Sequence, residues 1–390
     1  MAVSVNKKRT NTTFLILSVF AMCFVVAGHL DFDAFTLNGL FPYYSFHVPL
    51  FVFISGYFYK ETSEDYPLLF LKKKLISLMV PYLIWNLIYG AVVTFLHTRG
   101  YLFGENLNLR TLFIEPFLSG HQFMLNFPGW FVPALFLVEL IYLFSRKLLK
   151  IILFSATSSA STKKNMDTKK LFMEIFIIIT ALIVGVATVY LAKGGHVWGL
   201  YKFPGRLILM LFFYCFGFFY HTCLEKVDTL KNIPYFASIL LIQITITLFC
   251  NGVNYSVVWV TGFANMPLIP FITGITGIMF WLRISRLLSP ILEGSPVIEL
   301  IGNHTYSIML HHITILFIFN TIFCSLYARG IEAFADFDKD AYLLSVDYHY
   351  LPGANSSWQW ILFFSCMLIP AFGGVLYSRL KSKFHLLLHR

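Results

Sequence analysis

The chain has 390 residues and a formal net charge of +10, with 58% hydrophobic and only 12% charged residues. Soluble domains carry about 25% charged residues, so this composition excludes an ordinary soluble enzyme and indicates a membrane protein. The excess of Lys and Arg does not indicate a nucleic-acid partner, because basic residues collect in the cytoplasmic loops of membrane proteins.

Apolar stretches of about 20 residues recur along the chain, and each is long enough to cross roughly 30 Å of hydrocarbon as a helix. The segments between them are too short to fold alone. We therefore expect an all-α integral membrane protein with about ten transmembrane helices, forming one polytopic domain over residues 1–390. In chain order the expected spans are 13–30, 44–60, 75–97, 129–146, 171–192, 205–221, 234–251, 257–282, 299–323 and 357–378.

Lys and Arg residues distinguish the two sides of this membrane protein. If the N-terminus lies inside, most of the 29 Lys and Arg residues fall in the inner segments, as the positive-inside rule requires. Both termini are then cytoplasmic, and the protein belongs to the cytoplasmic membrane of the cell. We expect a cytoplasmic loop at 147–170, disordered in its polar part 154–170, and outer loops at 98–128 and 324–356 that pack over the outer mouth.

The first predicted helix ends in a histidine, His29, which follows the apolar run CFVVAG. An ionisable group at membrane depth is costly and is therefore a functional candidate. A neutral imidazole there could take a proton from an incoming hydroxyl as a general base. The competing interpretation is an interfacial histidine that reaches water, and position alone does not decide between the two.

The second predicted helix contains the stretch FHVPLFVFISGY at residues 46–57. Pro49 and Gly56 weaken the helix ladder, as expected where a helix opens to a substrate or where a neighbour approaches closely. His47 begins this helix at the depth of His29 and on the same side. We therefore expect the two imidazoles to flank one outward-facing cavity.

The stretch FHVPLFVFISGY resembles the second-helix signature of the membrane-bound acyltransferase-3 family. Four further matches follow the family order, namely VVAGH ending at His29, the basic stretch before Pro81-Tyr82, the pair Trp130-Phe131, and GNHTYSIMLHH with Gly302, Thr305, Tyr306 and His312. The resemblance implies an enzyme that moves an acyl group, usually acetyl, from cytosolic acyl-CoA to a hydroxyl of a cell-surface or exported glycan. It also implies that His29 is the catalytic histidine, with His47 beside it.

Acyl transfer to a hydroxyl needs a base, donors for the tetrahedral oxyanion, and a route between donor and acceptor. The candidates for oxyanion stabilisation or substrate positioning are Ser55, Tyr57, Arg206 and His312. Arg206 could instead pair with Glu139, whose carboxylate needs a partner in lipid. His312 could instead form a hydrogen bond between helices.

The basic triplet Lys72, Lys73 and Lys74 precedes the third span and is the expected phosphate clamp for acyl-CoA, the donor substrate. Positive-inside topology alone would explain Lys72 and Lys73, so Lys74 is the stronger candidate. At the end of the site that should hold coenzyme A the chain departs from the family, since Ser18 and Ser77 stand where basic residues are usual. An ammonium group does not reproduce the bidentate grip of a guanidinium on phosphate, which leaves open a different donor or a reduced activity.

Two alternatives to an enzyme remain open from the residues alone. A transporter or flippase would move a lipid-linked or acylated glycan without chemistry, and broken helices around a polar cavity would suit it. A membrane sensor that binds glycans is the third possibility. Tolerance of Gln at position 29 would favour a transporter over an enzyme that needs a base. No spacing of Cys or His residues indicates a metal site.

Overall fold

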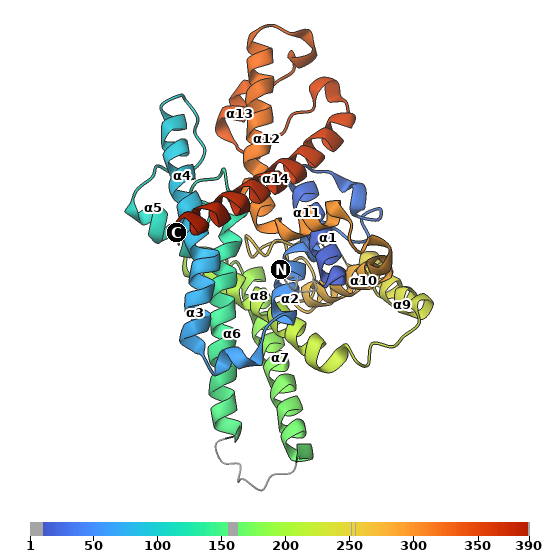
Figure 1. Ribbon diagram of the computed structural model, residues 1–390. Helices are drawn as coiled ribbons and strands as arrows, with labels where there is room; N and C mark the ends of the chain where they lie inside the picture. Colours follow the sequence, from blue (N-terminus) through green and yellow to red (C-terminus); the bar gives the residue numbers. More distant parts are fainter. Residues whose placement is uncertain (1–10, 155–162, 251, 254, 389–390) are drawn as a thin grey trace, which may run out of the picture.

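The computed structural model describes residues 11–154, 163–250, 252–253 and 255–388 (Figure 1). Within these residues the chain is helical and contains no strand, apart from an isolated β-bridge between Ser256 and Thr261. Nine of the described helices are long and apolar enough to cross a membrane, and the shorter apolar helix His47–Tyr57 accompanies them. The all-α membrane fold with about ten spans is thereby confirmed.

The helices follow one another with short connections over most of the described chain. In order they are α1 (Thr12–His29), α2 (His47–Tyr57), α3 (Pro67–Lys74), α4 (Val80–His97), α5 (Leu109–Phe113), α6 (Phe131–Phe154), α7 (Lys163–Lys193), α8 (Lys202–Phe219), α9 (Asn232–Phe249), α10 (Ile269–Leu292), α11 (Pro296–Asn303), α12 (Thr305–Ala328), α13 (Lys339–Leu344) and α14 (Ser357–Leu388). A π-helical segment, Leu75–Met79, joins α3 to α4, and another, Tyr220–Leu224, extends α8.

One predicted span is wrong at its beginning. The expected helix 257–282 starts only at Ile269, and the preceding residues form a loop. Val260 and Gly262 have positive φ angles of 54° and 83°, which a right-handed helix does not allow. Several residues of this loop line the cavity described below. Its apolar character therefore reflects packing around that cavity rather than a membrane crossing.

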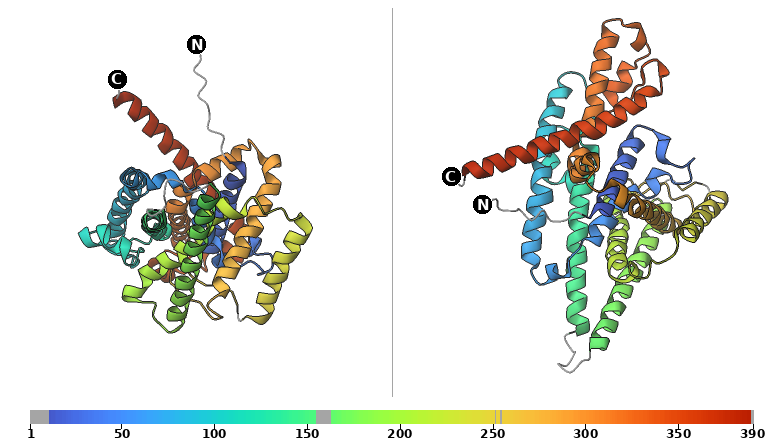
Figure 2. Two further views of the ribbon diagram at one scale, coloured as in Figure 1. Left: turned by 90° about the horizontal axis from the view of Figure 1, so that it is seen from below. Right: turned by 45° about the vertical axis from the view of Figure 1, so that its right-hand side comes forward.

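The predicted cytoplasmic loop is partly helical. Helix α6 continues to Phe154 and α7 begins at Lys163, so the expectation of disorder is wrong for residues 163–170. Residues 155–162 lie outside the described residues. Figures 1 and 2 show the two helices projecting together from the body of the molecule.

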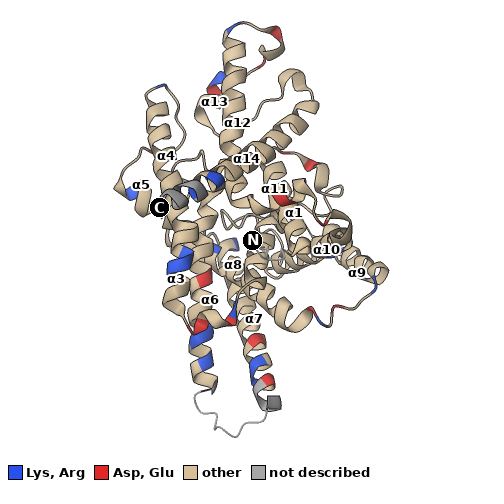
Figure 3. Ribbon diagram, viewed as in Figure 1, with Lys and Arg blue, Asp and Glu red and all other residues tan. Residues whose placement is uncertain are grey.

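A buried ion network joins α6 to α7. Arg146 on α6 is 1% exposed and donates to Glu64 at 2.7 Å and to Glu174 of α7 at 2.6 Å. Two buried carboxylates need such a partner, since an unpaired buried charge is costly. Figure 3 shows charged residues gathered toward the ends of these helices and in loops, as the low dielectric of the membrane interior requires.

Close packing of α2 on α8 fixes the position of the second helix. A Cβ atom at Gly56 would lie 2.0 Å from the carbonyl oxygen of Tyr214, and one at Gly217 would lie 2.1 Å from that of Phe53. Only glycine allows the two backbones to approach so closely. Gly56 is thus a point of close approach between helices, as expected, and the neighbouring helix is α8.

Candidate active site

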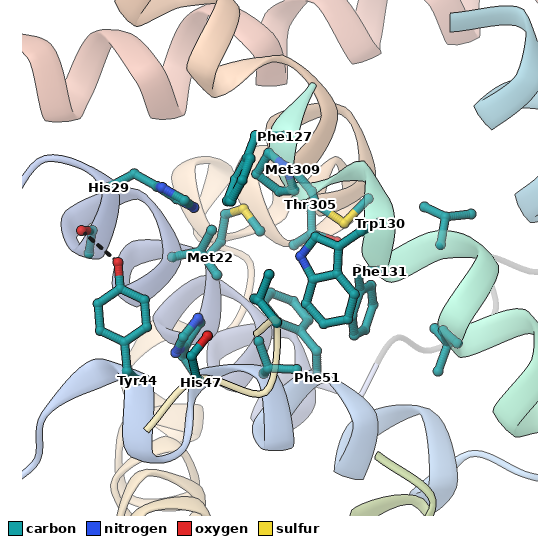
Figure 4. A pocket seen from close by; sticks show the side chains of 18 of the residues that line it. Met22, His29, Tyr44, His47, Phe51, Phe127, Trp130, Phe131, Thr305 and Met309 are labelled. Carbon is teal, nitrogen blue, oxygen red and sulfur yellow. Dashed lines mark hydrogen bonds between the residues drawn. The ribbon is translucent and has the colours of Figure 1, made fainter. Parts of the chain in front are cut away.

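A cavity of about 700 Å³ opens between α1, α2, the start of α6, α12 and the loop that precedes α10 (Figure 4). Its volume lies within the range of small-molecule sites, roughly 300 to 1,000 Å³. His29 and His47 both line it, as their shared depth predicts. Figure 4 shows the two histidines facing Trp130 and Phe131 across the space.

The cavity is long in the direction of the predicted membrane normal. Both Ser18 and His29 of α1 line it, and eleven helical residues correspond to about 16 Å. Its predicted outer end is bordered by Asp31, Tyr44, Asp347 and His349, and its predicted inner end by Ser18, Ser55, Leu78, Leu135, Thr305 and Tyr306. A ligand in this space can therefore contact groups at two well-separated depths.

His29 is the last residue of α1, and its ring lies between two other rings. The ring lies 5.3 Å from that of His312 and 5.7 Å, edge on, from that of Phe127, measured between centroids. Among the described residues no hydrogen bond engages either ring nitrogen. The neighbouring Gly28 carbonyl accepts a hydrogen bond of 3.1 Å from the hydroxyl of Tyr44, which holds Tyr44 beside His29.

His47 presents one defined nitrogen to the cavity. Its Nδ1 lies 2.6 Å from the carbonyl oxygen of Tyr43. Because a carbonyl can only accept, Nδ1 carries the proton and Nε2 keeps its lone pair. His47 is thus a hydrogen-bond acceptor on the cavity wall.

His312 does not line the cavity, but it lies behind His29. It is 1% exposed, and its Nδ1 donates to the carbonyl of Ile308 at 2.8 Å. Its Nε2 is buried and has no hydrogen-bond partner among the described residues. By the same tautomer argument this nitrogen is an acceptor without a donor, next to the ring of His29.

The two hydroxyls expected on α2 do not serve as oxyanion donors in this structure. Ser55 lines the cavity, but its hydroxyl donates to the carbonyl of Phe51 at 3.1 Å. Tyr57 lies away from the cavity and donates to Glu225 at 2.8 Å. Two residues along a helix correspond to a rotation of about 200°, so Ser55 and Tyr57 cannot face the same space.

Arg206 is also engaged elsewhere. It is fully buried and donates to the carbonyls of Val258 at 2.5 Å and Ser119 at 2.7 Å, and to Nε2 of His121 at 3.0 Å. Burial, followed by the charges of Arg206 and Lys202, lowers the pKa of His121 to about 2, so His121 is a neutral acceptor. Arg206 therefore joins the loops of the outer side to α8 rather than reaching the cavity.

Lys74 has a structural partner. Its Nζ lies 2.5 Å from Glu139, whose side chain is 2% exposed. Glu139 thus pairs with Lys74 and not with Arg206, the partner that the sequence had suggested for it. Lys74 was also the stronger candidate for binding coenzyme A, and its ammonium group is already bound to this carboxylate. Lys72 and Lys73 are exposed, and none of the three lysines lines the cavity.

A metal is not suggested by the arrangement of ligands. In the part of the chain that the structure describes, no group of three or more His, Cys, Asp or Glu residues is placed to bind a metal ion.

Sequence reasoning gave no chemical role to Trp130, although the Trp-Phe pair stood out as a motif. Trp130 lines the cavity, and Figure 4 shows its indole nitrogen turned into the space. No acceptor among the described residues binds that N–H group. Pro128, Phe131 and Val132 also line the cavity, so the amino end of α6, with its partial positive charge, faces the same space.

The outer rim contains acidic residues that are far apart in the sequence. Asp31 follows α1, and His349 Nε2 lies 4.0 Å from its carboxylate. Asp347 borders the same mouth, and partial removal from water, followed by the charge of Asp31, raises the pKa of Asp347. The outer loop 324–356 thus contributes to the mouth, as expected, but its individual contacts were not predictable from local patterns.

A family model described as an acyltransferase domain matches residues 16–380 of this chain. No curated protein and no solved structure matches this chain. The matched range includes every residue that lines the cavity. It also includes the five sequence motifs described above.

Proposed function

The chain belongs to the acyltransferase-3 family, and from that premise we propose that it transfers an acyl group, in the simplest case acetyl, from cytosolic acyl-CoA to a hydroxyl of a cell-surface or exported glycan. The observation that carries this proposal is the position of His29. Its ring lies on a cavity that extends from the inner part of α1 to the outer mouth. A base in that position can act on an acceptor from outside and a thioester from inside.

In the proposed reaction the acceptor hydroxyl attacks the thioester carbonyl, while a ring nitrogen of His29 takes the hydroxyl proton. The new C–O bond gives a tetrahedral oxyanion. This intermediate collapses as the C–S bond breaks, and the proton passes from His29 to the departing thiolate. The products are the acylated glycan and free CoA, and no further reactant is required.

Two neighbouring histidines support this step in the proposal. Nε2 of His312 accepts a hydrogen bond from one nitrogen of His29, which fixes the ring and favours the imidazolium that forms during attack. Nε2 of His47 accepts a hydrogen bond from a second hydroxyl of the acceptor. His312 acts through His29 and is a positioning residue, whereas His47 contacts the substrate.

The oxyanion would be stabilised from the opposite wall. The N–H group of Trp130 has no acceptor among the described residues, and the amino end of α6 adds a favourable potential for negative charge. Together they replace the hydroxyls of Ser55 and Tyr57 and the guanidinium of Arg206 in this role. Ser55 and Ser18 remain on the cavity wall as acceptors, since Ser18 likewise donates to the carbonyl of Phe14.

The donor would enter from the cytoplasmic side, with its thioester in the inner part of the cavity. Lys72 and Lys73 remain as exposed charges for the phosphates of CoA, whereas Lys74 is paired. The inner wall carries Ser18 rather than a basic residue. We therefore expect weaker binding of CoA than in relatives with an arginine at that place.

The test is turnover by the purified protein in phosphatidylcholine nanodiscs, with radiolabelled acetyl-CoA and a crude surface-glycan fraction as acceptor. Wild type should release CoA and label the glycan. His29→Gln should lower kcat by about 10² to 10⁴-fold, the usual contribution of a general base. His196→Gln is the matched control, because His196 is an exposed outer histidine that does not line the cavity.

Equal labelling of the glycan by wild type and His29→Gln would contradict the proposed base. Absence of labelling by both, with no binding of acyl-CoA, would contradict the acyltransferase assignment and favour the transporter. Thermal unfolding of each variant excludes loss of fold as the reason for lost activity.

A further inference from the structure

Two cations, Lys202 and Arg206, are buried close together beside the predicted outer half of the cavity, and neither has a carboxylate partner among the described residues. Arg206 is satisfied by two carbonyls and by His121. Lys202, one turn earlier on α8, is 7% exposed. Among the described residues no acceptor or carboxylate lies within hydrogen-bonding distance of its ammonium group.

Aromatic rings are the neighbours that Lys202 does have. Its Nζ lies 4.0 Å from the ring centroid of Trp259 and 5.6 Å from that of Trp198. Rings offset part of the cost of burying a cation, but they do not neutralise its charge. The other buried cations of the described chain, Arg146 and Arg283, have the carboxylate partners Glu174 and Asp228, and the partly buried Lys74 has Glu139.

The surroundings keep this region positively charged. His121 accepts a hydrogen bond from Arg206 and stays neutral, because burial and the two cations lower its pKa to about 2. Two positive charges and no negative charge therefore lie behind Trp259. A desolvated cation of this kind attracts an anionic group strongly, since little solvent screens it.

Lys202 does not line the cavity itself, but the two tryptophans beside it lie at the cavity and at the surface. Trp259 lines the cavity, so Lys202 lies one indole ring away from the substrate space. Trp198 is 64% exposed, and it belongs to a connection in which Gly195 and Gly199 have φ angles of 90° and 60°. These glycines allow the backbone conformation that places Trp198 over Lys202.

We propose that Lys202, between Trp198 and Trp259, binds an anionic group of the glycan acceptor, a carboxylate or a phosphate, and makes this protein selective for acidic glycans. The inference rests on the proposed acyltransferase function and names the substrate class of that site. Indole rings suit the apolar faces of sugars, so the same two residues would hold the sugar that bears the charge.

The acidic residues of the rim indicate how an acidic glycan would be oriented in the site. Asp31 and Asp347 border the mouth beside α1, whereas Lys202 lies on α8. Carboxylates accept hydrogen bonds from sugar hydroxyls and repel anions. An acidic glycan would therefore bring its neutral, hydroxyl-bearing part toward Asp31 and His29, and its charged part toward Lys202.

The experiment compares two acceptors that differ in one group, p-nitrophenyl β-glucuronide and p-nitrophenyl β-glucoside. CoA release is measured in phosphatidylcholine nanodiscs, which contain no anionic headgroup. Wild type should prefer the glucuronide by about tenfold in kcat/KM, as expected for one desolvated charge pair. In Lys202→Met the ratio of the two kcat/KM values should fall to about one.

Two further variants make the result specific. Lys202→Arg keeps the charge and should keep most of the preference. Lys193→Met removes an outer lysine that is bound to the carbonyls of Ala264 and Asn265, and it should leave the preference unchanged. A ratio of kcat/KM values does not depend on the fraction of folded enzyme, so partial misfolding of Lys202→Met does not obscure it.

Equilibrium dialysis of both glycosides against His29→Gln separates this inference from the proposed function. Glucuronide binding that needs Lys202 would support the site even if no acceptor is turned over. The inference would be overturned if wild type bound the two glycosides equally and turned them over with equal kcat/KM. It would also be overturned if neither glycoside bound. Loss of the preference when phosphatidylglycerol is added would assign the site to a lipid headgroup instead and would also overturn it.

Discussion

His311 and His312 are consecutive on α12, yet they have different neighbours. His311 shares a hydrogen bond of 2.6 Å with the hydroxyl of Tyr89 on α4, whereas His312 lies 5.3 Å from His29. Consecutive residues on a helix point about 100° apart. The chain thus provides its own control for the role of His312.

His312→Leu should lower kcat for acyl transfer by about 10²-fold with little change in the KM for acyl-CoA, because it removes the acceptor that orients the base. His312→Asn restores a side-chain acceptor and should recover part of the loss. His311→Leu is the control and should keep kcat close to wild type. Steady-state CoA release with purified variants measures all three. Loss of activity in His312→Asn equal to that in His312→Leu would contradict the positioning role.

At the residue scale, helix depth and periodicity predicted where His29, His47 and Ser55 would lie. The spacing of Ser55 and Tyr57 also contained the reason why only one of them faces the cavity. The partners of Arg206 could not be predicted, because they are backbone carbonyls of loops more than 50 residues away in sequence. Contacts with loop backbone leave no pattern in the amino-acid sequence.

The pairing of α2 with α8 is the contact between elements that most directly positions His47. Both backbones meet at glycines, where a Cβ atom would lie 2.0 to 2.1 Å from a carbonyl oxygen. Because a backbone oxygen cannot rotate away as a side chain does, the helices would have to separate. Separation of the helices would move the cavity wall.

Gly56→Ala should lower the stability of the fold by about 1–3 kcal/mol or more, the usual cost of overpacking. Gly373→Ala is the matched control, since a Cβ atom at Gly373 in α14 meets nothing within 4 Å. That variant should be as stable as wild type or slightly more stable. Thermal unfolding in detergent compares the two, and equal melting temperatures for both variants would contradict the close approach of α2 and α8.

At the element scale, apolar length was a good guide to the helices and a poor guide to the segment 257–268. That segment is apolar because Val258 and Trp259 line the cavity, and it is a loop because Gly262 and its neighbours break the helix. Hydropathy measures burial and does not distinguish burial in lipid from burial in protein. The error therefore fell on the loop that forms part of the site.

At the scale of the whole molecule, the cavity beside His29 links two depths of a membrane protein. Residues distant in sequence form it, such as Asp31 and Asp347 at the mouth and Ser18 and Tyr306 further in. A family resemblance predicted a membrane acyltransferase, which the family model supports, and the catalytic role that it implies for His29 stays a prediction. The resemblance did not predict the rim, because those contacts depend on how loops from opposite ends of the chain fold together.

We propose that an acyl group from one side of the membrane reaches an acceptor on the other side through this cavity. The most direct measurement uses sealed proteoliposomes with the cytoplasmic face outward, radiolabelled acetyl-CoA outside and p-nitrophenyl β-glucuronide trapped inside. We expect labelled glucuronide in the lumen with wild type and none with His29→Gln. Labelling only when donor and acceptor are on the same side, or equal labelling by the two proteins, would contradict it.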